Sequence, residues 1–439
     1  MKTIRCAAFA LSATLVLSAM TGCAAGSQTP TISFRLWDPQ VADAYRQSFA
    51  EFTARTGIDV DIVVIPWADY WTQLRADVAS GTVDDVFWTN AANFAMYAES
   101  DHLIDIRELL SPAAEEAWEP DVVAQYTLDG GLWGVPQLTD PGIGIIYNAD
   151  LLAAAGVSVR EVEALAWDPT TTEDTLRSVA TRLTADVDGR TPDDAGFDAT
   201  SVAHYGYNAS NDLNAIILQF LGSNDAAWQI GDRFAFDSEA GRESIQYVVN
   251  LINDYNVAPP ASDTNPPTGG DRARDLFLQG RLALFQTGAY NLANVVESAD
   301  FEWGIAPLPA GPAGAISVTN GVVAAASADS DDPDSQRRLL EWIASPEGSR
   351  EIGADGSGLP AVTAAQSAYF EYWRSKGVDI SPMLDVLENG TIQAPSGARY
   401  SAAETAYRPI LNEVFVGRVG VDIGLRDAQA AANAALDPR

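Results

Sequence analysis

Cysteine and histidine are both scarce in this sequence of 439 residues. The two cysteines, Cys6 and Cys23, lie close to the first residue, so the rest of the chain can form neither a disulfide nor a cysteine-based metal site. The only histidines are His102 and His204, which leave little for a histidine metal centre or a Ser-His-Asp triad. We therefore expect no metal ligands and no catalytic residues of these kinds.

Phosphate-binding motifs are also absent, and positive charge is limited. Neither GxxxxGK[ST] nor a strand-linked GxGxxG occurs, and we expect no cofactor. Lysine and arginine number 26 against 60 acidic residues, which gives a formal net charge of −34. Such a field repels nucleic acid and anionic lipid, so both are excluded as partners. It favours a cationic ligand such as a polyamine, but a solvated acidic surface explains the same charge.

Acidic residues could form two further kinds of site. A glycosidase-like pair needs only two acids about 5–10 Å apart, but no short motif marks such a pair. The segment TADVDGRTPDDA (184–195) partly matches a calcium-binding loop. Thr184 and Ala195 stand where that loop has its first aspartate and its bidentate glutamate, so we interpret the segment as a turn.

An apolar run near the start of the chain has the features of a secretory signal peptide. It extends from Cys6 to Met20, follows the basic residues Lys2 and Arg5, and is shorter than the ~20 residues of a membrane-spanning helix. No later segment is apolar for long enough to span a bilayer.

The residues Met20-Thr21-Gly22-Cys23 resemble the lipobox of bacterial lipoproteins. The resemblance implies a lipoprotein signal peptide at 1–22, acylation of Cys23 with fatty acids such as palmitate, and a polar tether at 23–30. The protein would then be anchored to the outer face of the cytoplasmic membrane. The alternative is a secreted protein cleaved nearby, in which Cys23 has no special role.

Residues 31–88 alternate between strand and helix patterns. TISFRLW (31–37) has the apolar-polar period of a strand, and IDVDIVVI (58–65) and DVFW (85–88) are expected strands as well. Apolar residues recur at helical spacing from Val41 to Phe52 and again from Trp67 to Val78. This order predicts an α/β fold with a largely parallel sheet.

The carboxyl ends of these three strands carry aromatic and short polar side chains. The candidates are Trp37, Asp38, Trp67, Trp88 and Asn90. Ligands bind at this edge of such sheets. An indole ring can cover the apolar face of a sugar while carboxylate and amide groups bind its hydroxyls. The convergence predicts a sugar site, although each tryptophan taken alone could equally belong to the core.

The alternation continues less regularly in the rest of the chain, and no fixed-period repeat is present. We expect a strand and a helix at 143–156, strands at 281–288 and 301–309, and helices at 333–348, 401–416 and 426–436.

Five segments, taken in order, resemble extracellular solute-binding proteins of family 1, the maltose-binding-protein-like receptors that deliver sugars to ABC importers. Each segment is weak by itself, but their order behind a lipobox is specific, and the resemblance covers nearly the whole chain after residue 22. The segments are DVFWTNAANFAMYAESDHLIDI (85–106), GGLWGVPQLTDPGIGIIYNADLLAAAG (130–156), DLFLQGRLALFQTGAYNLANV (275–295), WGIAPLPAGPAG (303–314) and LLEWIASPEG (339–348).

The resemblance implies a two-lobed α/β fold, periplasmic-binding-protein-like of type II, with the ligand held in a cleft between the lobes. About three chain crossings form the hinge, and glycine and proline near 138–142, 319–321 and 353–359 fit them. The expected division gives 31–138 and 319–352 to the first lobe, 139–318 to the second, and 353–439 to the hinge and a C-terminal helical part that lies mainly in the second lobe.

The resemblance also assigns ligand contacts. Trp37, Asp38 and Asn90 correspond to positions where the first lobe reaches sugar hydroxyls. Asp140 precedes a second-lobe strand, where relatives place a polar or aromatic contact. Tyr290 stands where the family usually has tryptophan, and it still offers a ring for stacking.

Three more positions follow from the same resemblance. Asn320 and Gly321 stand where many members have a glycine pair that lets the backbone approach the ligand. Arg399 could reach into the cleft with a bidentate donor fork. A surface arginine is the alternative for Arg399.

The implied function is capture of a mono- or oligosaccharide by a monomer that closes its lobes around the sugar and delivers it to the permease subunits of an ABC transporter. No covalent chemistry on the sugar is required. Two alternatives remain, namely a membrane-anchored extracellular carbohydrate-active enzyme and a binding protein for a cationic solute such as a polyamine.

Overall fold

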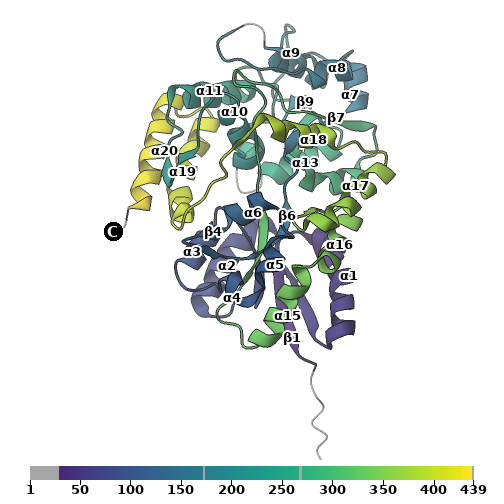
Figure 1. Cartoon of the computed structure of the whole chain (residues 1–439). Coiled ribbons are helices and arrows are strands. Elements are labelled where there is room, and N and C mark those ends of the chain that lie inside the picture. The colour runs from purple at the N-terminus through teal and green to yellow at the C-terminus, as the bar shows by residue number, and fades with distance from the viewer. Residues whose placement is uncertain (1–28, 172–173, 266–268, 438–439) are drawn as a thin grey trace, which may run out of the picture.

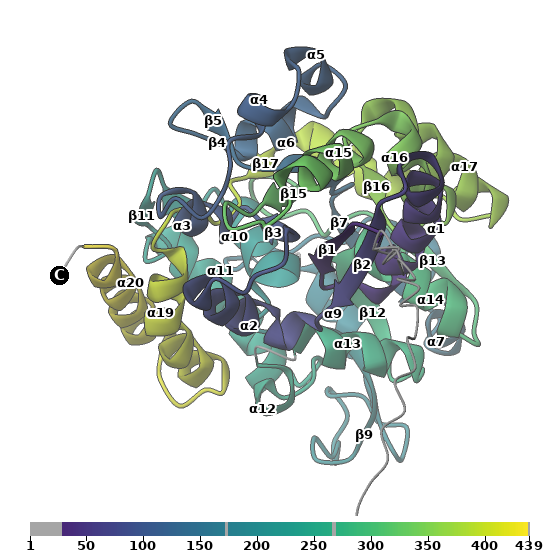
Figure 2. The ribbon, with the colours of Figure 1, turned by 90° about the horizontal axis from the view of Figure 1, so that it is seen from below.

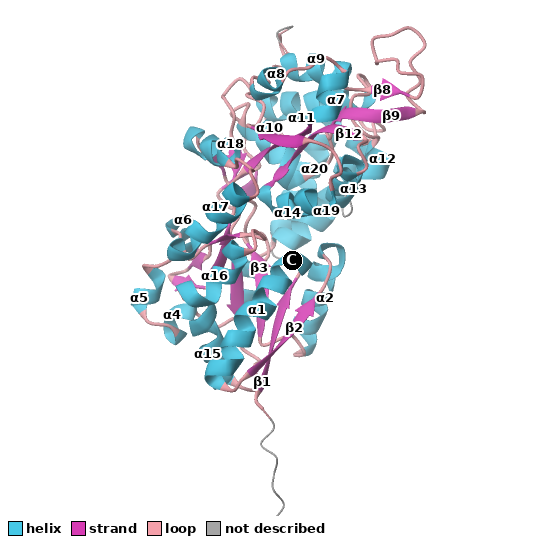
Figure 3. Ribbon diagram, turned by 90° about the vertical axis from the view of Figure 1, so that its right-hand side faces the viewer, coloured by secondary structure: helices cyan, strands magenta, loops and turns pink. Residues whose placement is uncertain are grey.

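The chain folds into two lobes, each built on its own β-sheet with helices around it (Figures 1 and 3). The structure is a computed structural model that describes residues 29–171, 174–265 and 269–437. The expected signal peptide and Cys23 lie outside these residues. We call the lobe with the first strand lobe 1 and the other lobe 2. Within the described ranges, no helix is both long enough and apolar enough to cross a bilayer.

The lobe 1 sheet is mixed rather than largely parallel. From one edge to the other it contains β16 (Leu359–Pro360), β6 (Val135–Thr139), β15 (Val322–Ala326), β3 (Val86–Asn90), β1 (Thr31–Leu36) and β2 (Asp59–Val64). β1 is parallel to β2 and β3, whereas β15 is antiparallel to β3 and β6, and β16 is antiparallel to β6. β15 starts at the hinge, where β1 and β3 end, and therefore runs in the opposite direction to them.

The two helices predicted from the apolar spacing at 41–52 and 67–78 are present, with slightly wider bounds. α1 (Pro39–Thr56) begins after Asp38, whose side chain accepts hydrogen bonds from two backbone N–H groups of the first turn. It ends at Gly57, where φ is 71°. α2 (Trp67–Ser80) ends in the same way at Gly81. The shorter elements of this part of lobe 1 are α3 (Phe94–Ala98), α4 (Ile106–Leu109), α5 (Pro112–Glu115), α6 (Pro120–Gln125), β4 (Thr127–Leu128) and β5 (Gly131–Leu132).

The single helix expected at 333–348 is in fact two helices. α15 (Pro333–Ile343) ends before Ser345, and α16 (Pro346–Ala354) begins after it. The Ser345 hydroxyl accepts a hydrogen bond from the Gly348 N–H at 3.1 Å and so caps the new helix. Pro346 has no N–H with which to continue the first helix. α16 packs against α1 in lobe 1.

Lobe 2 is built on a five-stranded sheet, from β13 (Trp303–Ala306) through β7 (Ile143–Asn148), β12 (Leu282–Gly288) and β9 (Val202–Tyr207) to β8 (Ala185–Asp186). Around it lie α7 (Ala149–Ala154), α8 (Val159–Glu163), α9 (Thr175–Arg182), η1 (Leu213–Ile217), α10 (Leu218–Gly222), the hairpin of β10 (Gln229–Ile230) and β11 (Arg233–Phe234), α11 (Glu239–Asn253), α12 (Ala261–Thr264), α13 (Gly269–Leu278) and α14 (Leu292–Ser298). α19 (Tyr400–Phe415) and α20 (Val421–Leu436) form a helical hairpin that packs on α11, drawn yellow in Figure 1.

The chain passes between the two sheets three times. It leaves β6 at Thr139 and enters β7 at Ile143, and it returns to lobe 1 between β14 (Ser317–Val318) and β15. β14 pairs with β17 (Thr391–Ile392).

The third passage lies later than the expected one near 353–359. β16 still pairs with β6 of lobe 1, and α17 (Gln366–Ser375) packs on α16. The chain reaches the lobe 2 sheet again at α18 (Ser381–Asp385), which contacts β7 and β13. The part of the chain that returns to lobe 1 therefore extends beyond residue 352.

Candidate ligand-binding site

Trp37 is the centre of an aromatic cluster at the end of β1. Its ring centroid lies 5.3 Å from that of Trp67, 5.1 Å from Tyr70, 5.5 Å from Trp71 and 4.9 Å from Trp88. All four contacts are edge-to-face or tilted, which aromatic pairs prefer over a face-to-face sandwich. Trp67 is 45% exposed, and Trp37 and Trp71 are half-buried. Lobe 1 thus presents a fixed aromatic surface on which an apolar face can stack.

Trp88 lies beneath this surface. It is 1% exposed, and its indole N–H donates a hydrogen bond to the Tyr45 hydroxyl at 3.3 Å. The prediction that Trp88 contacts a ligand is therefore wrong. β3 is an inner strand whose side chains are buried in both directions, so Trp88 supports Trp37 from below. Trp71, which was not among the predicted ligand contacts, is half-buried beside Trp37 and Trp67 and forms part of this aromatic surface.

Two polar side chains of lobe 1 lie at the same edge of the sheet. Burial raises the pKa of the Asp38 carboxyl, an effect opposed by its hydrogen bonds to the start of α1 and by the guanidinium of Arg274 on α13 of lobe 2. Asn90 ends β3, and its Oδ1 accepts a hydrogen bond from Asn93 Nδ2 at 2.8 Å. Asp38 therefore lies where the two lobes approach each other.

Asp140, Asp212 and Tyr290 come together on the hinge side of lobe 2. The Asp140 carboxylate accepts a hydrogen bond from the Gly142 N–H at 3.0 Å, and burial raises its pKa to about 7. Asp212 caps η1 by accepting from the Ala215 N–H at 2.9 Å, and burial raises its pKa as well. The pKa of the Tyr290 hydroxyl is raised by burial and then by the negative charges of Asp212 and Asp140.

Tyr290 nevertheless keeps 41% of its surface exposed. Water can reach one side of the ring while protein atoms and two carboxylates surround the residue, as expected at the wall of a cleft. Asp212 was missed by the sequence reasoning. Its only signal is an aspartate ahead of an apolar helical run, which is typical of a helix cap.

Gly321 lies at the second crossing, but its backbone is not available to a ligand. Its N–H donates to Gln125 Oε1 at 2.7 Å, and its carbonyl oxygen accepts from the Tyr126 hydroxyl at 2.5 Å. A Cβ at this position would lie 2.6 Å from Cγ1 of Val122. The expected role of Gly321 is thus corrected, because this glycine lets the hinge pack against α6.

Asn320, the preceding residue, joins the crossing to lobe 2. Its Nδ2 donates a hydrogen bond to Asn214 Oδ1 in η1 at 2.5 Å. Since Asn214 lies two residues after Asp212, this bond places Asn320 near the group formed by Asp140, Asp212 and Tyr290. Asn320 is half-buried.

Side chains of the two lobes touch on two flanks of the junction between the lobes. On one flank, Gln40 of α1 donates to Asn294 of α14 at 3.4 Å. On the other, Arg75 of α2 donates to Ser401 of α19 at 3.2 Å, and Figure 2 shows these two helices next to each other. Arg399 lies on this second flank, where it is exposed and lines a groove together with Arg75.

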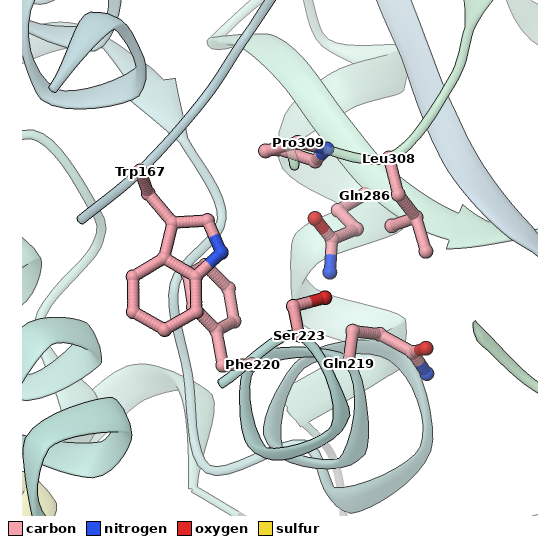
Figure 4. Close-up of a pocket in the computed structure, with 7 residues that line it drawn as sticks. All are labelled: Trp167, Gln219, Phe220, Ser223, Gln286, Leu308 and Pro309. Atoms are coloured by element: carbon pink, nitrogen blue, oxygen red, sulfur yellow. The ribbon is translucent and has the colours of Figure 1, made fainter. Parts of the chain in front are cut away.

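A narrow gap in lobe 2 is lined by Trp167, Gln219, Phe220, Ser223, Gln286, Leu308 and Pro309 (Figure 4). Among its walls, Trp167, Phe220 and Gln286 are at most 2% exposed. Gln286 also forms two hydrogen bonds, since its side chain accepts from the Tyr207 hydroxyl at 2.5 Å and donates to the Ala215 carbonyl at 2.6 Å. The gap is too narrow to hold a water molecule, so it is part of the packed interior and not a ligand site.

The segment 184–195 forms the turn that its sequence suggests. The Asp186 carboxylate accepts hydrogen bonds from the backbone N–H groups of Asp188, Arg190 and Asp198, at 2.8–3.1 Å. The Arg190 guanidinium contacts Asp188 at 2.7 Å and lies 3.7 Å from Asp186. Backbone N–H groups and one arginine therefore take the place that a cation would have in a calcium loop.

Comparisons with known proteins agree with this architecture. The family of bacterial extracellular solute-binding proteins matches residues 38–350. The crystal structure of UspC from M. tuberculosis is 50% identical, has a TM-score of 0.72 and covers 92% of this chain and 100% of that chain. The ABC substrate-binding protein Lmo0181 from Listeria monocytogenes, solved in complex with cycloalternan, is 18% identical, with a TM-score of 0.79 and coverage of 93% and 99%.

A probable ABC transporter-binding protein of Deinococcus radiodurans is 23% identical in an alignment of 424 residues that covers 91% of this chain and 93% of that protein. The family match spans well over half of the chain, from the start of α1 into α16. It therefore includes the first two chain crossings and the Asp140, Asp212 and Tyr290 group, and it begins one residue after Trp37. The chain belongs to the family of bacterial extracellular solute-binding proteins.

Proposed function

We propose that this protein captures a sugar in the cleft between its lobes and delivers it to the permease of an ABC transporter. The observation that carries the proposal is the pairing of the Trp37-centred aromatic surface of lobe 1 with the carboxylates and the tyrosine ring of lobe 2. Sugars need both kinds of contact, because their C–H faces stack on aromatic rings while their hydroxyls bind carboxylates and amides.

In this proposal the roles divide between the lobes. Trp67, Trp37 and Trp71 cover one face of the sugar, and Tyr290 covers another part of it. Asp38, Asn90, Asp140 and Asp212 accept or donate hydrogen bonds at its hydroxyls. A ligand that contacts both lobes favours the closed state in proportion to its extra affinity for that state, and the permease then recognises closure.

The relatives found by structure and by sequence support the same function. The Listeria protein was solved in complex with cycloalternan, and the Deinococcus protein is described as a probable ABC transporter-binding protein. We further propose that Cys23 carries the lipid anchor and that the protein acts as a monomer on the outer face of the membrane. Mass spectrometry of the membrane fraction tests the anchor, because acylation of Cys23 shifts the mass of the N-terminal peptide and a Cys23→Ser variant abolishes that shift.

A cationic solute is the second candidate, and one observation favours it. Asp140 and Asp212 are surrounded by protein, and neither forms an ion pair with an arginine or lysine within the described residues. A ligand ammonium group would neutralise them. Asp38 is different, since it is near Arg274.

The deciding experiment is a calorimetric titration of the chain from residue 24 onward against mono-, di- and oligosaccharides and against spermidine and putrescine. Saturable binding of a sugar that is recovered unchanged by chromatography supports the proposal. Binding of the polyamines alone supports the second candidate. Recovery of a cleaved sugar would instead make the protein a carbohydrate-active enzyme and overturn the proposal of a non-enzymatic receptor.

A further inference from the structure

The groove between α2 of lobe 1 and the start of α19 of lobe 2 has features that the sugar-binding cleft does not explain. Its volume is about 510 Å³, within the range of about 300–1,000 Å³ that small-molecule sites occupy. Its polar walls are formed by Arg75, Glu99, Ser100, Arg399, Ser401 and Thr405. Arg75 comes from lobe 1 and Arg399 from lobe 2, so the groove is completed only when the lobes are close together.

The two arginines lack acidic partners in a chain with a large excess of acids. Within the part of the chain that the structure describes, the Arg399 guanidinium makes neither an ion pair nor a hydrogen bond, and the side chain of Arg75 bonds only to Ser401 Oγ. Glu99 lines the same groove, yet no ion pair within 4.0 Å joins it to either arginine. By contrast, the more buried Arg35 contacts both Asp77 and Asp84. The groove therefore offers two guanidinium groups with unused donors.

One residue of the groove, Arg75, lies on the same face of α2 as two tryptophans of the aromatic surface. Trp67, Trp71 and Arg75 are spaced four residues apart, which places them on the same side of the helix. Each step of four residues advances about 6 Å along the axis. A ligand stacked on Trp71 would therefore reach Arg75 with a group one turn further along the helix.

We infer that the ligand carries an anionic group, a carboxylate or a phosphate, that binds between Arg75 and Arg399. This inference rests on the proposed sugar-binding function and adds the ligand's charge and its extent along α2. A guanidinium presents paired N–H donors that match carboxylate and phosphate oxygens. Because the two arginines belong to different lobes, the anion bridges them and favours closure.

The test compares matched sugars that differ only in charge. Calorimetric titrations use glucose, maltose and lactose, each as the neutral sugar, as the corresponding carboxylic acid and as a phosphate ester. We expect an acidic form to bind at least about ten-fold more tightly than its neutral parent, since a hydrogen bond to a charged group contributes on that scale. The carboxylate and phosphate arms show which anion the groove prefers.

Variants locate the effect in the groove. Arg75→Gln and Arg399→Gln remove one guanidinium each. We expect either change to abolish the preference for the acidic form, measured as the ratio of its affinity to that of the neutral parent in the same variant. Arg338→Gln is the control, because Arg338 is an exposed arginine of α15 that has no ion pair in the described residues. It should keep the full preference.

The outcomes separate this inference from the function on which it rests. Neutral and acidic forms that bind equally overturn the anion site and leave the sugar receptor intact. A preference for acidic sugars that survives both groove variants also overturns it. If no sugar binds in either form, both the receptor function and the anion site fail.

Discussion

The indole ring of Trp37 contacts that of Trp88 edge-on, with centroids 4.9 Å apart and ring planes 71° apart. The two rings differ in what they face. Trp37 is half-buried at the wall of the cleft, whereas Trp88 is 1% exposed and bonded to Tyr45. Substitutions at the buried and at the exposed members of this cluster should therefore affect different measurements.

Trp88→Ala should lower stability far more than it lowers intrinsic affinity. Removing a buried indole leaves a cavity under Trp37, and such truncations cost about 3–5 kcal/mol of unfolding free energy. Urea denaturation followed by circular dichroism measures this cost, and Trp88→Phe should lose much less because most of the volume is kept. An unchanged unfolding midpoint for Trp88→Ala would contradict the position assigned to this ring.

Trp67→Ala should have the opposite effect. The ring is 45% exposed, so its loss costs little stability, but the sugar loses a stacking partner and affinity falls by about ten-fold. Calorimetry gives the affinity and thermal unfolding gives the stability. Ile423→Ala is the matched control, since Ile423 is a 52% exposed apolar residue of α20. Equal affinity for Trp67→Ala and the control would argue against stacking on this surface.

The elements that the sequence predicts well are those decided by local signals. α1 lies between the Asp38 cap and Gly57, and α2 ends at Gly81, because capping and positive φ are properties of a few neighbouring residues. The boundary between α15 and α16 at Ser345-Pro346 also depends on neighbouring residues, but the apolar periodicity continues across it and predicts one helix.

The features that the sequence does not reveal depend on distant contacts. Arg75 lies in the groove because α19 approaches α2, and its partner Ser401 is 326 positions away. Gly321 packs on Val122 nearly two hundred residues earlier, so its role could not be separated from that of a ligand-contacting glycine. Trp88 looked like a cleft residue because the antiparallel strand that encloses it, β15, enters only after the chain has passed through lobe 2.

Asp140→Asn should make the unliganded protein relatively more stable at high pH. Burial raises the pKa of this carboxyl to about 7 from its usual value near 4. At pH values between these two, the carboxyl is protonated in the folded state and ionised in the unfolded state. Stability contributed by the wild-type carboxyl therefore falls as pH rises through this window, and the loss remains in full above it. Asparagine has no proton to lose.

The measurement is urea denaturation of both proteins at pH 4 and pH 8. The free energy of unfolding of Asp140→Asn, relative to wild type, should be higher at pH 8 than at pH 4. Burial also raises the pKa values of Asp38 and Asp212, but both residues are present in both proteins, so their contributions cancel. An equal difference between the two proteins at pH 4 and at pH 8 would contradict the raised pKa of Asp140.

Gly321→Ala should destabilise the hinge through a steric clash that a second substitution can relieve. The added Cβ would lie 2.6 Å from Cγ1 of Val122 and 3.2 Å from Oε1 of Gln125. Helix α6 and the chain segment that crosses from lobe 2 into lobe 1 must therefore move apart. Overpacking of this kind costs about 1–3 kcal/mol. Thermal and urea unfolding of the single variant should show the loss.

The double variant Gly321→Ala/Val122→Ala distinguishes a clash from a loss of backbone freedom. Val122→Ala alone removes buried methyl groups and should also destabilise, but in the double variant the alanine methyl at 321 occupies the space that the valine vacated. We therefore expect the double variant to be more stable than the sum of the two single effects predicts, with a coupling energy of about 0.5–3 kcal/mol. Strict additivity would show that Val122 is not what excludes a side chain at this crossing, and that the hinge there tolerates a Cβ by moving elsewhere.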